Sequence, residues 1–275
     1  MDNSLEPRLP SELEREIFEL AARSDPSNRL NYLLTAQRTN IWLEHIIYET
    51  VTQVYRAGRA DNSLTFPVPS EHRRRVRDLL LGGTVDSALA TEALKQCPEV
   101  TNLALWCSVT RDTLDIISHL PLRRLSADFY RLMISINRDN TYTRLPLSSF
   151  QGLTHLEFSS YCSDWQECRE LAELPRLTHL SFNKGAPSVV LRGALAECKA
   201  MQVLVWLVFH YDNSPLFECQ PKTHVASVKE KRLVHLSQPA DAIVSNWLAE
   251  TRGDKCYWDF AEMIISKRVG KNPVS

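Results

Sequence analysis

Apolar residues near the start of the chain recur at the spacing of an α-helix. They fall at positions i, i+4, i+7 and i+8, with one more beside them, which predicts an amphipathic helix with a single apolar face. Ser11 and Glu14 fit the S-x-x-E pattern of a capping box, so we expect Ser11 to cap this helix. The apolar positions are Leu13, Ile17, Phe18, Leu20 and Ala21.

Two further apolar stripes predict two more helices. The first consists of Leu30, Leu33 and Leu34, and the second of Trp42, Leu43, Ile46 and Ile47. We expect a break between them near Thr39 and Asn40. Three helices in about 40 residues are close to the lower limit for independent folding. The unit therefore either packs against the rest of the chain, as a plain N-terminal cap, or binds another protein.

A polar stretch and a basic run separate this unit from the rest of the chain. Residues 57–70 are rich in turn-forming residues and predict a connector. Residues 71–81 predict a short helix with a basic face. The run from Arg73 to Arg77 has two interpretations, a solvated helix face or a nuclear-import signal.

From residue 89 onwards a leucine pattern repeats. Five units of the form L-x-x-L-x-L place leucines at Leu103, Leu125, Leu156, Leu180 and Leu204, with spacings of 22, 31, 24 and 24 residues. A period near 24 with this core is typical of leucine-rich repeats, in which each unit is a short strand followed by a return segment. Stacking of the units buries the leucines together, and the longest unit carries an insertion over residues 131–149.

Residues between the inward-facing leucines of such strands point to the opposite face. We expect that face to hold a protein target, and the alternative is a face that is merely solvated. Two histidines at equivalent positions also suggest a metal, but a firm site needs three or four ligands, so we predict no metal and no cofactor. The predicted target-binding residues are His155, Glu157, His179 and Ser181.

The last part of the chain predicts two helices that cap the final repeat. One carries Ile243, Val244, Trp247 and Leu248 on one face, and the other carries Trp258, Ala261, Ile264 and Ile265. The predicted fold class is α/β. The predicted organisation is a helical domain over 1–56, a linker with short helices over 57–88, a repeat solenoid over 89–236 and capping helices over 237–275.

Composition narrows the classes of function. Hydrophobic residues make up 44% and the net charge is −1, which allows a proper core and disfavours nucleic-acid or acidic-membrane partners. The longest apolar run, Val203 to Phe209, is too short to span a bilayer. Seven cysteines without a C-x-x-C pair favour reduced thiols in an intracellular protein. We find no catalytic motif and predict no enzyme, with a catalytic site invisible in the sequence as the alternative.

The N-terminal motif resembles an F-box, whose pattern is roughly L-P-x-E-L followed by I-F. The first half matches at Leu9, Pro10, Glu12, Leu13, Ile17 and Phe18. The second half, with Trp42 slightly later than usual, matches at Leu33, Leu34, Ala36, Arg38 and Trp42. This variant, together with the end of the chain, is similar to F-box-like proteins abundant in mushroom-forming fungi.

The resemblance implies a substrate adaptor of a Skp–cullin–F-box ubiquitin ligase, in the cytoplasm, the nucleus or both. A Skp-type adaptor, and through it a cullin, would bind the helices, and the repeats would hold an unknown protein target, with the chain a monomer within the hetero-complex. The alternative is an interaction scaffold that has lost adaptor binding. The adaptor-binding residues implied by the resemblance are Leu9, Pro10, Leu13, Ile17, Phe18, Leu33, Leu34 and Trp42.

Overall fold

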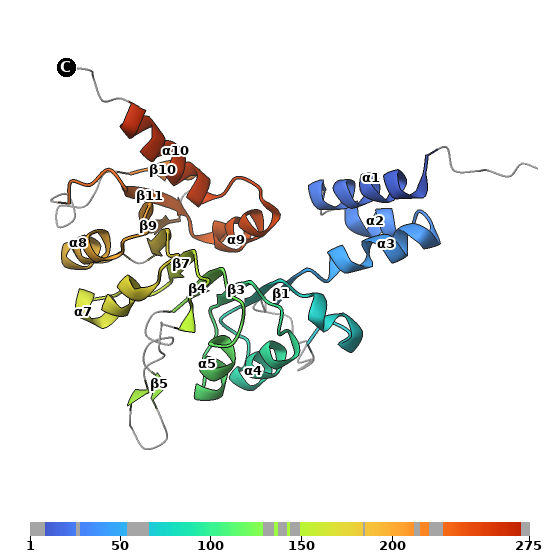
Figure 1. Ribbon diagram of the computed structural model, residues 1–275, viewed down its shortest axis with the longest axis horizontal. Coiled ribbons are helices and arrows are strands. Elements are labelled where there is room, and N and C mark those ends of the chain that lie inside the picture. The colour runs from blue at the N-terminus through green and yellow to red at the C-terminus, as the bar shows by residue number, and fades with distance from the viewer. Residues whose placement is uncertain are drawn as a thin grey trace, which may run out of the picture.

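A computed structural model describes residues 9–25, 28–53, 66–128, 135–136, 142–143, 149–183, 185–211, 215–219 and 228–270 (Figure 1). These residues form an α/β protein around an open, mostly parallel sheet of nine strands in the order β1-β2-β3-β4-β7-β8-β9-β11-β10. The predicted α/β class is confirmed. Most of the insertion over 131–149 lies outside the described residues.

The elements alternate along the chain after an all-helical start. The main-sheet strands are β1 (Thr50–Gln53), β2 (Asp78–Leu81), β3 (Asn102–Leu105), β4 (Arg124–Ala127), β7 (His155–Phe158), β8 (His179–Phe182), β9 (Val203–His210), β10 (Phe217–Glu218) and β11 (Leu233–Pro239). A separate hairpin pairs β5 (Ser135–Ile136) with β6 (Tyr142–Thr143). The α-helices are α1 (Ser11–Ser24), α2 (Arg29–Leu33), α3 (Gln37–Ile47), α4 (Ser87–Gln96), α5 (Arg111–Ile117), α7 (Trp165–Cys168), α8 (Ser188–Glu197), α9 (Ile243–Arg252) and α10 (Tyr257–Gly270). The 3₁₀ helices are η2 (Ser70–Arg75), η4 (Arg169–Glu173) and η5 (Ala240–Ala242).

A ladder of leucines runs across the sheet. The five predicted leucines pair in register from Leu103 to Leu204, which confirms the spacing argument. The ladder is longer than predicted, because Leu79 precedes Leu103 and Leu233 follows Leu204 in the same register. All seven side chains are buried. Each fully buried leucine stabilises the fold by about 1.5–3 kcal/mol, so this row anchors the strands to the helices beneath them.

Helices cover both faces of the sheet (Figure 1). The leucine face packs on α4, α5, α7 and α8 in the main core. The opposite face carries two smaller apolar contacts, one at each end. Near the start of the sheet, Trp247 of α9 packs on Leu80 and Ala104. Near its end, Trp258 and Ala261 of α10 pack among the apolar side chains of β9 and β11.

Several predicted boundaries are wrong. The expected helix over 71–81 is a 3₁₀ turn, η2, followed by strand β2, so the expected linker over 57–88 supplies a strand of the main sheet. The C-terminal helices lie across the face of the sheet rather than on the end of the last repeat. Their apolar faces are wide enough to bury strand surface, which is more favourable than covering one short edge.

The N-terminal helices also differ in detail from the prediction. Ser11 is the first residue of α1 and makes no capping hydrogen bond, because Pro10 occupies the N-cap position. Helix α3 runs without a break through Thr39 and Asn40, and the break falls at residues 34–36. A small core of Ala22, Leu43 and Ile46 holds the three helices together.

A substitution at Gly193 tests the contact between α8 and Trp165 of α7. A Cβ added at Gly193 would overlap the indole ring of Trp165, whose Nε1 donates a hydrogen bond to Glu197 Oε1 at 2.7 Å. Alanine is the better helix former by about 1 kcal/mol. Overpacking opposes this gain, so we expect Gly193→Ala to lower the free energy of unfolding by about 1–3 kcal/mol in urea titrations. Gly270→Ala is the control, because nothing lies within 4 Å of its added Cβ. A Gly193→Ala variant as stable as the wild type would contradict the tight contact.

Candidate functional site

Exposed apolar side chains are concentrated on the three N-terminal helices. Of the thirteen large hydrophobic residues exposed in the described part of the chain, seven belong to this unit. We call these seven the helical face: Leu9, Leu13, Ile17, Leu20, Leu30, Leu34 and Ile41, with exposed fractions from 45% for Leu9 to 84% for Leu34. So many exposed apolar side chains on so small a unit make it a candidate interaction site.

The structure divides the predicted adaptor-binding residues into two groups. Leu9, Pro10, Leu13, Ile17 and Leu34 are exposed. Phe18 and Leu33 instead pack against the small core of the unit. Trp42 is partly buried, with the guanidinium of Arg38 over its ring at 6.0 Å. The alternative of a plain N-terminal cap is wrong, because the face that a cap would bury is open to solvent.

A polar joint attaches the helices to the sheet. The rings of Tyr48 and His72 stack with their centroids 4.4 Å apart. Glu44 of α3 contacts His72 Nε2 at 3.2 Å and Arg75 Nη1 at 3.4 Å, both in η2. Two residues after Tyr48 the chain enters β1, which pairs with β2 along its whole length. The unit that carries the helical face is therefore joined to the sheet through β1 and through these side-chain contacts.

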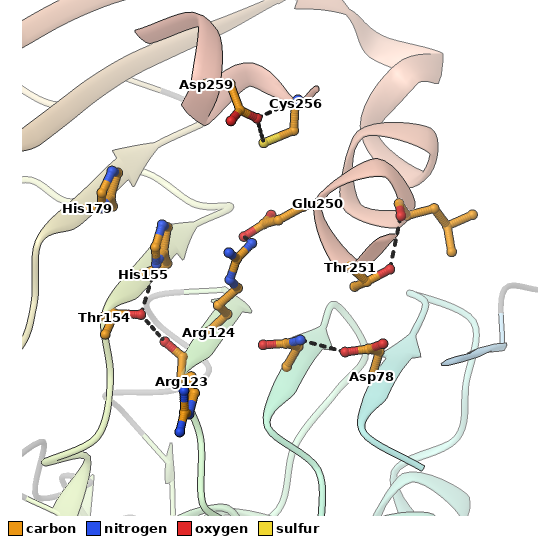
Figure 2. Close-up of polar contacts among 12 residues, drawn as sticks. Asp78, Arg123, Arg124, Thr154, His155, His179, Glu250, Thr251, Cys256 and Asp259 are labelled. Atoms are coloured by element: carbon orange, nitrogen blue, oxygen red, sulfur yellow. Dashed lines mark hydrogen bonds and ion pairs between the residues drawn. The ribbon is translucent and has the colours of Figure 1, made fainter. Parts of the chain in front are cut away.

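A second candidate site lies where the two C-terminal helices meet the sheet. The turn between α9 and α10 passes over the first residues of β4, β7 and β8, and Arg124, His155 and His179 point from these strands toward it (Figure 2). A cavity of about 230 Å³ opens there, which we call the α9–α10 cleft. Its lining residues are Arg124, His155, His179, Glu250, Gly253, Asp254, Cys256, Trp258, Asp259 and Glu262.

The predicted target-binding residues do not form an open recognition surface. The exposed fractions are 8% for Glu157, 5% for His179 and 0% for Ser181, and His155 is partly buried. The expectation of an exposed strand face is wrong, because α9 and α10 cover it. Only the two histidines reach the α9–α10 cleft.

An ion pair spans the cleft. Arg124 Nη1 lies 2.7 Å from Glu250 Oε1, and the carboxylate side chain is only 8% exposed. Burial raises the pKa of Glu250 to about 7, although Arg124 opposes the shift. The pair links β4 to α9, and these two residues are 126 positions apart in the sequence.

The two histidines form a stacked pair beneath α10. Their rings lie 4.1 Å apart at an interplanar angle of 9°, and each is nearly perpendicular to the ring of Trp258, at 79° and 87°. His155 Nδ1 contacts Thr154 Oγ1 at 2.9 Å, and His179 Nε2 contacts Glu262 Oε1 at 2.9 Å. Burial, the neighbouring His179 and Arg124 together lower the pKa of His155 to about 2. Burial also lowers the pKa of His179, against the pull of Glu262. Both rings are therefore neutral at pH 7.

A buried polar network continues behind the histidines. Asn183 donates a hydrogen bond to Glu157 Oε1, and Ser181 Oγ donates one to Asn183 Oδ1 at 3.0 Å. Burial raises the pKa of Glu157. The recess that reaches this carboxyl group measures about 10 Å³, close to the limit for one water molecule. Glu157 therefore supports the site from behind rather than meeting a larger ligand.

The chemistry available in the cleft is limited. Burial raises the pKa of the Cys256 thiol to about 12, so it is not a thiolate nucleophile at neutral pH. Among the described residues, no group of three or more histidine, cysteine or acidic side chains is arranged to hold a metal ion. Arg124, Glu250 and Glu262 were missed from the sequence, because nothing in their local patterns shows that distant elements bring them together.

The histidine pair predicts a pH dependence of stability. Below pH 6.5 the unfolded chain binds a proton at His155, whereas the folded chain does not until about pH 2. The free energy of unfolding therefore falls as the pH drops below 6.5. At pH 5 we expect this residue to remove about 2 kcal/mol of stability relative to pH 7.5. Urea titrations of wild type and His155→Gln at both pH values measure the difference, and the variant should lose that much less.

The comparison with the variant isolates the histidine. Glu250 acts in the opposite sense, because the raised pKa of its folded carboxyl group lets the folded chain gain stability as the pH falls from 7 toward 4.5. Its contribution is common to both proteins and cancels in the difference. The same substitution at the exposed His119 controls for removing one histidine. Equal losses in wild type and His155→Gln would contradict the prediction.

Comparisons with known proteins identify no relative of this chain. No family model, curated protein or solved structure matches the chain. In the part of the chain that the structure describes, none of the helices is both long and apolar enough to cross a membrane. The assignment of function therefore depends on the residues and contacts of this chain.

Proposed function

We propose that this chain is a substrate adaptor of the F-box type. In this proposal the three-helix unit binds a Skp-type adaptor subunit, and through it a cullin, in the cytoplasm or nucleus. The strand–helix units form an irregular leucine-rich-repeat-like solenoid that holds a protein target. The adaptor makes no bond itself and acts by raising the concentration of the target near the conjugating enzyme.

The observation that carries the proposal is the helical face. A surface helix of a globular protein normally turns its apolar stripe toward the core, yet Leu13 is 49% exposed and Ile17 54% exposed. Leu9 and Pro10, which lead into α1, are exposed beside them. The Leu-Pro step and the apolar face of α1 are the features that resemble the F-box, and an apolar partner surface accounts for their exposure. The in-register leucine ladder supports the repeat part of the proposal.

An enzyme is the second candidate, and the α9–α10 cleft is the observation that favours it. Clustered groups with strongly shifted pKa values, here Glu250 and His155, are typical of active sites. However, the Glu250 carboxylate is held by Arg124 and the Cys256 thiol is protonated at neutral pH, so the cleft offers no activated nucleophile. The geometry supports binding better than catalysis.

The test of the adaptor proposal replaces two exposed residues of α1. Glutamine is a good helix former, so Leu13→Gln/Ile17→Gln should preserve α1 while removing apolar contact. We expect capture of a purified Skp-type adaptor subunit to weaken by about tenfold or more, since buried interface anchors contribute over 1 kcal/mol each. The melting temperature should stay nearly unchanged, because exposed substitutions alter stability by about 0.5 kcal/mol or less.

Val189→Gln is the matched control for this test. Val189 is 50% exposed and lies on α8, far along the chain from the helical face. Its substitution should leave capture unchanged. Absence of capture by the wild-type chain would favour a scaffold that has lost adaptor binding. A large fall in melting temperature of the double variant would mean that α1 is packed within the chain instead.

A further inference from the structure

We propose that the α9–α10 cleft binds a lysine or arginine side chain presented by a partner protein. The cleft lies outside the proposed adaptor-binding surface and uses other elements of the fold. Identifying the partner as a ubiquitination target rests on the proposed function, whereas the binding itself does not.

The cleft has the size of a side-chain pocket. Its volume is about 230 Å³. A cavity of about 15 Å³ admits one water molecule, and one of about 150 Å³ admits benzene. The cleft therefore has room for the methylene stem and charged end of a long side chain.

The placement of polar residues shows that the cleft is built into the sheet. On the face that α9 and α10 cover, β2 and β3 contribute Leu80 and Ala104, and β9 contributes Val203 and Val205. In the row of Leu80, Ala104 and Val205, the three strands between them carry Ser126, Glu157 and Ser181 instead. In the neighbouring row, which ends at Val203, the same three strands place Arg124, His155 and His179 in the cleft. Apolar residues there would pack more favourably, because buried polar groups are costly unless they are paired. Packing alone therefore does not explain the polar residues on these three strands.

The charge of the lining selects a cation. Arg124 is paired with Glu250, whose carboxyl group has a pKa of about 7 and is therefore partly ionised at pH 7, and both imidazoles are neutral at that pH. The acidic residues that remain in the lining are Asp254, Asp259 and Glu262. No other basic residue lines the cleft within the described part of the chain, so the field inside it is negative.

The walls fit the rest of such a side chain. Trp258 and the stacked imidazoles of His155 and His179 give the cleft an aromatic side. Lysine and arginine bury their methylene stems along apolar surface and keep the charged end near acceptors. Glu262, with 53% of its side chain exposed, places one such acceptor at the rim beside His179. A bare metal ion does not fit, because the described residues offer no cluster arranged as metal ligands.

Nuclear magnetic resonance of the full chain tests the proposal with small probes. The probes are N-acetyl-lysine methylamide and N-acetyl-arginine methylamide, and the controls are the norleucine and glutamate analogues. We expect at least one basic probe to shift the backbone amides of Gly253 and Glu262 saturably, with a Kd in the millimolar range. Absence of a shift with both basic probes would overturn the proposal, as would equal shifts with norleucine or glutamate.

Paired variants separate the cleft from general electrostatics. Asp254→Asn/Glu262→Gln removes two exposed charges and keeps an oxygen to accept from His179, so the fold should survive. It should raise Kd about tenfold, as the loss of two solvent-exposed ion pairs predicts. Glu170→Gln/Glu173→Gln removes the same charge from a depression of about 450 Å³ on the opposite helical layer. This control should leave Kd unchanged, and equal Kd values for the two double variants would overturn the proposal. Adaptor capture is a separate measurement, so its failure is distinguishable from failure here.

Discussion

The register of the leucine ladder is the constraint on which the rest of the structure depends. Pairing Leu79 with Leu103, and so on to Leu233, turns one row of the seven strands from β2 to β11 toward the main core. Because side chains alternate along a strand, the same register fixes which residues meet α9 and α10 on the other face. A slip by one residue would turn the histidines toward the helices of the leucine face and the leucines toward α9 and α10. The ladder therefore determines both the stability of the domain and the composition of the cleft.

The leucine face could be predicted from the sequence because each unit repeats its own pattern. Leu156 and Leu180 even sit in identical Leu-Thr-His-Leu tetrapeptides. Strand β2 was missed because the basic run before it dominates the local pattern. Its buried Leu79 belongs to the same leucine ladder. Helix α1 was predicted correctly, although its cap was not, because Pro10 takes the position that Ser11 would need.

The covered face could not be predicted from the strand repeats alone. His179 and Ser181 look like solvent-facing residues, since strands with one open face alternate apolar and polar residues. The strand repeats do not show what covers that face. It is covered by helices that lie more than 60 residues further along the chain. One signal was present, because the apolar run from Val203 to Phe209 reads as a strand buried on both sides. A cover over β9 implies a cover that extends toward β8, and α10 provides it.

The polar centre of the covered face explains how the cleft persists between two apolar contacts. Trp247 secures α9 at β2 and β3, and Trp258 with Ala261 secures α10 at β9. Between them, the partly buried pair of Arg124 and Glu250 contributes little net stability, because desolvation of Glu250 offsets much of the attraction. Removing Arg124 alone would leave the Glu250 carboxyl group buried without its partner and would be far more damaging.

The joint at Tyr48 relates the two candidate surfaces to each other. Helix α3 continues into β1, and β1 is hydrogen-bonded to β2, so the helical face is connected to the cleft through paired strands rather than a free linker. Glu44, His72 and Arg75 add polar contacts across the same joint. An adaptor that acts by position needs such a connection, because a flexible one would lower the effective concentration of a bound target at the conjugating enzyme. In the proposed adaptor, the joint is thus the part of the fold that connects the two candidate surfaces.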